Sequence, residues 1–294
     1  MDAFPNLRCR QLHPPVDPLP NKALTNTLTR TFSGDRVEPP THTIMNSNVV
    51  VKPSAEEVAT AACFWLIDAV RETIEQSGRC VVALSGGSTP KKLYEIIARD
   101  HLTAVDWSKV HLLWGDERNV PHDHSESNYL MVKTAWIDPA IASAQAEKIP
   151  NFYPVPIEVH DPEKVAYQYG QTIRSVLGQS PAIDVVLLGL GDDAHTASLF
   201  PETQALESVD GFVANYVPKF ESFRLTMTAS LINRAKRVAF LVCGQSKEPA
   251  LDVVWHGPRD PKLYPAQLIN PAEGELWWFL DTPALPTRDR VNLG

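Results

Sequence analysis

Residues 182–201 read AIDVVLLGLGDDAHTASLFP, and this stretch decides the fold. Its apolar run is short, partly β-branched and flanked by turn residues, which predicts a buried parallel strand rather than a helix. Gly189 and Gly191 allow the backbone to turn sharply where the strand ends and to approach a ligand closely. In open α/β sheets, ligands bind beyond the carboxyl ends of the strands. We therefore expect His195, which can exchange a proton near neutral pH, to lie where chemistry occurs.

The alternative for His195 is an ordinary position in a surface turn. The two glycines, the acidic pair Asp192-Asp193 and the nearby strand end all argue against it. We therefore treat His195 as the leading candidate for a catalytic side chain.

Composition narrows the class of protein. The chain has 294 residues, of which 44% are hydrophobic and 21% charged, as is normal for a globular protein. No apolar run approaches the ~20 residues needed to cross a bilayer, so no membrane partner is expected. The net charge of −8 provides no global field for nucleic acid, which is likewise not an expected partner. An anionic small substrate would need local arginine and lysine side chains.

The cysteines indicate a reducing compartment. They are far apart, lack the paired spacing of a metal site and stand mostly in apolar runs, where a thiol behaves as a small buried hydrophobe. The first residues lack the basic and apolar regions of a secretory signal. We expect a cytoplasmic protein without a metal site. The four cysteines are Cys9, Cys63, Cys80 and Cys243.

The chain divides into three regions. Residues 1–48 are rich in proline, threonine and asparagine and lack apolar periodicity, which predicts a disordered or loosely attached extension. Over residues 49–284, strands alternate with helices without a repeat or a clear linker. The first helix has a capping box at Ser54 and Glu57, and Gly78 ends it. This pattern predicts an α/β fold, a single Rossmann-like domain whose mainly parallel sheet is flanked by helices. Residues 285–294 are expected to form a tail.

A glycine-rich loop, residues 85–90, follows the predicted strand at 80–84 and precedes a helix. Strand, glycine-rich turn and helix together predict a phosphate site, because free backbone N–H groups and the positive end of the helix dipole face an anion there. The loop matches neither the Walker pattern nor G-x-G-x-x-G, and a tight turn before a capped helix is the alternative. The candidate phosphate-binding residues are Ser85, Gly86, Gly87, Ser88 and Thr89.

Charged residues follow two further strand ends. Asp116-Glu117-Arg118 come after the predicted strand at 110–114, at the same expected edge of the sheet. Lys247 comes after the strand at 238–243, near a helix start, where a cation slightly disfavours the helix and so hints at a ligand role. A solvated surface position is the alternative for both. Residues 224–228, beginning with Arg224, alternate like a strand.

Four stretches together resemble the 6-phosphogluconolactonase family of the pentose phosphate pathway, over about residues 50–284. The third stretch is highly specific. The four are Leu84-Ser85-Gly86-Gly87-Ser88-Thr89-Pro90; Trp114-Gly115-Asp116-Glu117-Arg118 with Val120-Pro121 and Ser127-Asn128-Tyr129; Gly189 to Pro201; and Arg224-Leu225-Thr226 with Asn233, Gly244 and Lys247.

The resemblance implies a fold shared with amino-sugar phosphate deaminases. It also implies a cytosolic enzyme that hydrolyses 6-phospho-D-glucono-1,5-lactone to 6-phosphogluconate without a metal or another cofactor. One departure matters, because the family usually has glycine immediately before the histidine and this chain has Ala194. If that position needs a positive φ, alanine costs on the order of 1 kcal/mol.

We expect His195 to act as the general base that takes a proton from water attacking the lactone carbonyl, and later to return one to the ring oxygen. Asp116 or Asp193 would orient the imidazole, in the manner of a catalytic triad without the serine. Backbone N–H groups of the glycine loops would stabilise the oxyanion. The cations expected on the phosphate are Arg118, Arg224 and Lys247, with Ser88 and Thr89 assisting.

Two other functions stay open. A glucosamine-6-phosphate deaminase would share the glycine loop and the histidine, but its motif after the histidine ends in Asn-Glu-Pro, where this chain has Ser198-Leu199-Phe200-Pro201. A sugar-phosphate-binding regulator on the same fold usually carries a DNA-binding module, and residues 1–48 show no helix-turn-helix pattern. The oligomeric state is open as well, and a monomer fits the sequence.

Overall fold

The computed structural model describes residues 47–143, 148–157, 161–180 and 182–290, all within one compact unit. Most of the predicted extension, residues 1–46, lies outside the described residues, as do the last four residues of the predicted tail. Strand β1 begins at Ser47, two residues before the boundary that we expected. This strand pairs with β10, from Ser47 opposite Leu276 to Lys52 opposite Asp281, and forms an edge of the sheet. It was not predicted from the sequence.

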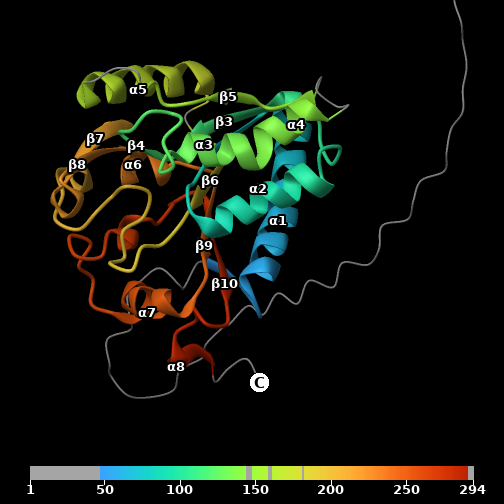
Figure 1. Ribbon diagram of the computed structural model, residues 1–294. Coiled ribbons are helices and arrows are strands. Elements are labelled where there is room, and N and C mark those ends of the chain that lie inside the picture. Colours follow the sequence, from blue (N-terminus) through green and yellow to red (C-terminus); the bar gives the residue numbers. More distant parts are fainter. Residues whose placement is uncertain (1–46, 144–147, 158–160, 181, 291–294) are drawn as a thin grey trace, which may run out of the picture. The chain divides into compact units, whose positions relative to one another are not determined.

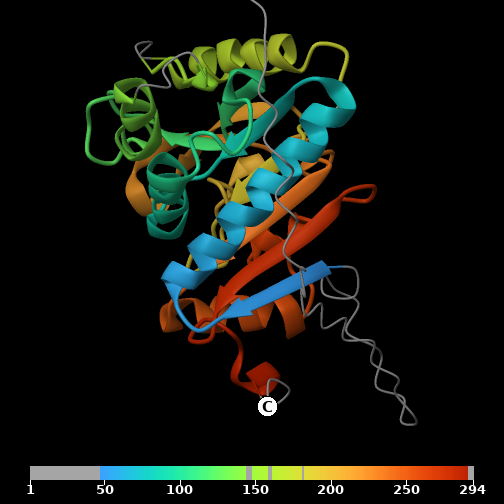
Figure 2. The same cartoon turned by 90° about the vertical axis from the view of Figure 1, so that its right-hand side faces the viewer.

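Within the described residues, seven strands form a parallel sheet in the order β1-β10-β9-β6-β2-β3-β5 (Figures 1 and 2). This confirms the predicted α/β class. The strand β6 lies inside the sheet, between β9 and β2, and all four of its residues are buried. The strands are β1 (Ser47–Lys52), β2 (Cys80–Leu84), β3 (Val110–Trp114), β5 (Asn151–Tyr153), β6 (Val185–Leu188), β9 (Arg237–Val242) and β10 (Glu275–Asp281).

A second, antiparallel sheet was not predicted. It has the order β4-β8-β7, with β4 (Asp116–Arg118), β7 (Phe212–Val217) and β8 (Ser222–Met227). From the sequence we expected residues 116–118 to lie just beyond a strand end, without a strand of their own. The backbone of Gly115 explains the difference, since its N–H binds Leu84 in the main sheet and its carbonyl accepts from Met227 at the end of β8. The chain therefore passes directly from one sheet to the other.

Four longer helices pack around the sheets. Helix α1 begins at the predicted N-cap, where Ser54 Oγ accepts from Glu57 N as in a capping box and donates to the Glu57 carboxylate. It ends at Gly78, with φ of 78°. It lies beside α2 and against β10 (Figure 2). Its Trp65 packs on Trp277 and Phe279 of β10. The longer helices are α1 (Ala55–Ser77), α2 (Ser88–Asp100), α5 (Pro162–Leu177) and α7 (Glu248–His256).

Helix α5 joins the two sheets. The hydroxyl of Tyr169 accepts from the Trp114 N–H on β3 and donates to the Tyr153 carbonyl on β5, while its ring packs on Phe212 of β7 at 4.7 Å. Tyr169 is fully buried, so the small sheet is held against the large one by a side chain with both hydrogen bonds satisfied.

The short helices are α3 (Asn128–Val132), α4 (Asp138–Ala142), α6 (Ala229–Ile232) and α8 (Thr287–Arg290), and a π-helical turn, Lys133–Ile137, joins α3 to α4. Helix α8 falls in the predicted tail, yet it is folded. Its Arg290 pairs with Glu248 of α7, Asp289 pairs with His256, and Leu285 just before it is buried. Residues 285–290 therefore extend the packed part of the chain.

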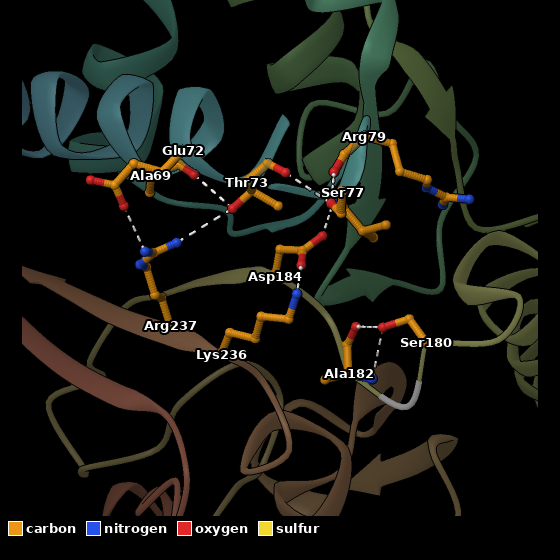
Figure 3. A network of polar contacts seen from close by, with 11 residues as sticks. Ala69, Glu72, Thr73, Ser77, Arg79, Ser180, Ala182, Asp184, Lys236 and Arg237 are labelled. Carbon is orange, nitrogen blue, oxygen red and sulfur yellow. Dashed lines mark hydrogen bonds and ion pairs between the residues drawn. The ribbon is translucent and has the colours of Figure 1, made fainter. Parts of the chain in front are cut away.

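A polar network closes the edge of the sheet where β2, β6 and β9 begin (Figure 3). The buried carboxylate of Asp184 accepts from the backbone N–H of Val81 at 2.8 Å and pairs with Lys236 Nζ at 2.7 Å. Next to it, Arg237 bonds Glu72 and Thr73 of α1. The strands run away from this edge, so the network stabilises the amino ends and leaves the carboxyl ends open for chemistry.

None of the helices in the described ranges has the length and apolar character that a membrane span requires.

Candidate active site

The loop after β6 places His195 on top of Gly191. The N–H of Gly191 donates to the His195 carbonyl at 2.8 Å and that of Ala194 to the Gly191 carbonyl at 3.0 Å, which folds the loop back on itself. A β-carbon at position 191 would lie 1.9 Å from His195 Nδ1, so the imidazole occupies the space that only glycine leaves free. Ala194 has φ of 60°. This is the left-handed region, where we expected alanine to cost conformational free energy relative to glycine.

Asp193 orients the imidazole. Its Oδ1 lies 2.5 Å from His195 Nδ1, and its Oδ2 accepts from Lys219 Nζ at 2.9 Å. The hydrogen bond from His195, with the Lys219 ammonium adding to it, holds the pKa of the Asp193 carboxyl well below its usual range. An ionised Asp193 keeps the proton of neutral His195 on Nδ1 and leaves Nε2 as the basic nitrogen. The Nε2 atom has no hydrogen-bond partner among the described residues.

Asp116, the other aspartate that the sequence offered as an orienting group, serves a different purpose. Its buried carboxylate accepts from Ser198 Oγ at 2.7 Å and from Asn128 Nδ2 at 3.3 Å, and no contact joins it to His195. Asn128 in turn lies directly beneath Gly86, where a β-carbon would meet its Oδ1 at 2.1 Å. Asp116 therefore ties the glycine loop and the histidine loop to β4.

Two arginines face each other on the small sheet. Arg118 of β4 is paired in register with Arg224 of β8. Burial, followed by repulsion from Arg118, lowers the pKa of Arg224 below its ordinary value. Their side chains bond neutral oxygens, the Glu126 carbonyl and the Ser222 hydroxyl, and neither forms an ion pair within the described residues. Two adjacent guanidinium groups without an ion-pair partner among the described residues have the chemistry to bind a multiply charged anion.

Glu117, which immediately precedes Arg118 in β4, anchors this strand. Its buried carboxylate accepts from the backbone N–H groups of Arg118, Asn128 and Tyr129 and from Ser127 Oγ. Burial raises its pKa in spite of these bonds. The carboxylate thereby holds the start of α3 against β4 and fixes the backbone from which Arg118 projects.

A row of rings connects the histidine with the arginines. The His195 ring stacks on Phe200 with centroids 4.1 Å apart, Phe200 meets Phe220 edge-on at 5.5 Å, and the Arg224 guanidinium lies 5.0 Å from the Phe220 ring centre. Asp193 and Phe200 also line a cavity of about 260 Å³ that reaches Lys219. The sheet with the arginines is thus in contact with the loop that carries the base.

The glycine loop presents its backbone rather than its hydroxyl groups. Gly87, at the start of α2, has φ of 104°, and no side chain caps the first N–H groups of that helix. Ser88 is exposed there. Ser85 and Thr89 are buried, and the Ser85 hydroxyl donates to the Gly86 carbonyl. A helix start whose first N–H groups have no side-chain cap fits an anion site.

Lys247 lies at the same edge of the sheet, but its side chain already forms an ion pair. Its ammonium pairs with Asp192 at 2.6 Å. The structure therefore brings the predicted Lys247 to the histidine loop, with its charge offset by a carboxylate of that loop.

Sequence reasoning missed three residues of this site. Lys219 and Phe220 lie in the short turn Pro218–Phe220 between β7 and β8, and Phe200 lies at the end of the histidine loop. The turn has no motif and no periodicity in the sequence. Its part in the site is seen only in the structure, where Lys219 bonds Asp193. Phe200 was visible within the motif, but nothing in the pattern indicates that it stacks on His195.

The fold is α/β, and the loops beyond its strand ends bring together a carboxylate–histidine pair and two arginines, an arrangement suited to the class of enzymes that act on anionic substrates. Residues 53–278 match the family model for glucosamine-6-phosphate isomerases/6-phosphogluconolactonase, and the chain belongs to this family.

Individual relatives agree. The chain is 42% identical over 244 residues to the 6-phosphogluconolactonase of Nostoc sp., covering 82% of this chain and 98% of that protein. It is 44% identical over 219 residues to the 6-phosphogluconolactonase of Synechocystis sp., covering 73% and 87%. Among solved structures, the 6-phosphogluconolactonase from Trypanosoma cruzi is similar with a TM-score of 0.72 and 28% identity, covering 83% of this chain and 97% of that one.

Proposed function

We propose that this chain hydrolyses 6-phospho-D-glucono-1,5-lactone to 6-phospho-D-gluconate, the lactone-opening step of the oxidative pentose phosphate pathway. The observation that carries the proposal is the Asp193–His195 pair, whose unpartnered Nε2 lies in the loop that contacts the small sheet with its two arginines. The family match and the relatives named 6-phosphogluconolactonase support it.

In this mechanism, His195 Nε2 takes a proton from water as the water oxygen attacks the lactone carbonyl carbon. The resulting tetrahedral intermediate carries an oxyanion, which backbone N–H groups of the loop at Gly86–Gly87 stabilise. The bond between that carbon and the ring oxygen then breaks, and the proton on Nε2 passes to the leaving ring oxygen. A lactone is an activated ester, so no covalent nucleophile is needed. Asp193 stabilises the imidazolium that exists between the two proton transfers.

The phosphate of the substrate would bind Arg118 and Arg224, with the uncapped start of α2 and Ser88 contributing N–H and hydroxyl donors. Lys247 would contribute only by exchanging its Asp192 partner for the phosphate. Asp116 has no chemical role in this scheme, because its contacts with Ser198 and Asn128 make it a structural group.

The cell compartment in this proposal is the cytoplasm. The described cysteines are free thiols, and burial raises the pKa of Cys63 and of Cys80 to about 12. Such thiols stay protonated and buried, as suits a reducing compartment.

The test is an assay with freshly prepared 6-phosphogluconolactone, in which product formation is measured by enzymatic oxidation of 6-phosphogluconate and corrected for spontaneous hydrolysis. We expect saturable acceleration over the uncatalysed rate. Ammonia release from glucosamine 6-phosphate, with no lactone hydrolysis, would instead identify a deaminase. Tight binding of 6-phosphogluconate without any turnover would identify a sugar-phosphate-binding protein.

A further inference from the structure

Lys219 approaches the proposed base from a different part of the chain. It lies in the turn Pro218–Phe220, at the tip of the hairpin between β7 and β8, and the turn closes at Glu221 with φ of 47°. From there its ammonium reaches Asp193 Oδ2 at 2.9 Å. Its neighbour Phe220 packs on Phe200, the ring on which His195 stacks. The hairpin tip thus contacts both groups that pack against the His195 ring, the Asp193 carboxylate and the Phe200 ring.

The two oxygens of Asp193 have separate partners. Oδ1 is used by His195, through Nδ1 at 2.5 Å and the backbone N–H at 3.3 Å, and Oδ2 is used by Lys219. A carboxylate bonded at one oxygen alone can rotate and exchange its oxygens. Lys219 occupies the second oxygen, so the carboxylate plane is fixed and Oδ1 remains aimed at Nδ1.

Stability does not account for this contact. The Lys219 side chain is 60% exposed, and an ion pair at such a position contributes on average about 0–1 kcal/mol to folding. Its second effect is on charge. An imidazolium at position 195 would share its counterion with the Lys219 ammonium, which weakens the stabilisation of the protonated ring and favours the basic form.

The other charged groups around this pair are engaged elsewhere or lie farther along the row of rings. Asp192 of the same loop pairs with Lys247 at the start of α7, and the Arg224 guanidinium of β8 lies 5.0 Å from the centre of the Phe220 ring. Glu202 lines the cavity next to Asp193. Among the described residues, the side chains that pair with the Asp193 carboxylate are those of His195 and Lys219.

We propose that Lys219 is a positioning residue for His195, acting through Asp193 to fix the imidazole and to keep it in its basic form. This inference rests on the proposed lactone hydrolysis for its kinetic consequence. Its structural consequence, on the titration of His195, does not depend on any substrate.

The test compares Lys219→Met, which keeps the length and apolar stem without the charge, with Lys219→Arg, which keeps the charge. Lys262→Met is the matched control, since Lys262 is an exposed lysine whose ammonium pairs with Glu207 and does not contact Asp193. For Lys219→Met we expect kcat to fall roughly 3- to 10-fold with KM nearly unchanged. The acid side of the kcat/KM profile should move to higher pH. Lys219→Arg should keep most of the wild-type kcat and a nearly wild-type pH profile. Lys262→Met should behave as wild type.

The independent readout is the NMR titration of the His195 ring, assigned by its loss in His195→Ala. We expect its midpoint to move to higher pH in Lys219→Met and to stay in place in Lys262→Met. A midpoint that does not move in Lys219→Met overturns the inference, whether or not the enzyme is active. Absence of wild-type lactonase activity would contradict the proposed function alone, and the titration would still decide the role of Lys219.

Discussion

The imidazole of His195 lies so close to the α-carbon of Gly191 that a β-carbon there would come within 1.9 Å of Nδ1. Gly191→Ala must therefore displace the proposed base without changing the chemical identity of any other side chain in the site. We expect kcat for lactone hydrolysis to fall at least about 100-fold, the lower range for losing a general base. Gly189→Ala is the matched control, since a β-carbon there meets Ser85 Oγ at an ordinary 4.0 Å. Equal rates for the two variants would contradict the described geometry.

Removal of the proposed base gives the reference value for the loss of kcat. His195→Ala should lower kcat by roughly 10²–10⁴-fold, because the water must then lose its proton without a positioned acceptor. His195 is partly exposed, so circular dichroism and the melting temperature should change little. Unchanged turnover would remove His195 from the mechanism.

Arg224 should act on binding rather than on chemistry. We expect Arg224→Ala to raise KM for the phosphorylated lactone about 10- to 100-fold, the value of one charge-assisted contact of about 1.5–3 kcal/mol. Hydrolysis of unphosphorylated gluconolactone, which lacks the anion, should be unaffected. A variant with a normal KM would place the phosphate elsewhere.

The Asp193 contacts also make stability depend on pH. The pKa of Asp193 is lowered in the folded state, so its stabilising contribution is fully present above the unfolded value of about 3.9 and is lost as the pH falls below that value. The melting temperature of Asp193→Asn should accordingly lie below that of wild type at neutral pH. The gap should narrow as the pH approaches 3. A gap that is constant with pH would show that the carboxylate charge does not contribute.

Ala194 tests the cost of a positive φ. In Ala194→Gly, relief of about 1–2 kcal/mol of left-handed strain is opposed by about 0.5–1 kcal/mol of chain entropy and about 0.8 kcal/mol for the buried methyl group. These terms nearly cancel, so we expect the free energy of unfolding to change by less than about 1 kcal/mol.

Ala194→Val is the contrasting variant, because a β-branched residue is strongly disfavoured at φ of 60° and the site is buried. Its stability should fall by more than about 2 kcal/mol in urea unfolding. If valine proves as stable as glycine, the loop does not hold the left-handed conformation in solution.

The sequence was sufficient for features that depend on neighbouring residues. The strand at 80–84, the capping box at Ser54 and Glu57, and the turn after β6 are all local, since periodicity, hydrogen bonds within one helical turn and the steric freedom of glycine act over a few residues. His195 and its position beyond a strand end could be predicted for the same reason.

Only the tertiary structure decided which aspartate contacts the His195 ring and which groups surround the pair. Asp116 stands beside Thr226 and Ser198, and Asp193 beside Lys219, because strands far apart in the chain pair in one register. Such contacts arise from sheet pairing and core packing, which set the positions of whole segments, and neither Lys219 nor the three-residue strand β4 carries a local pattern that could reveal them.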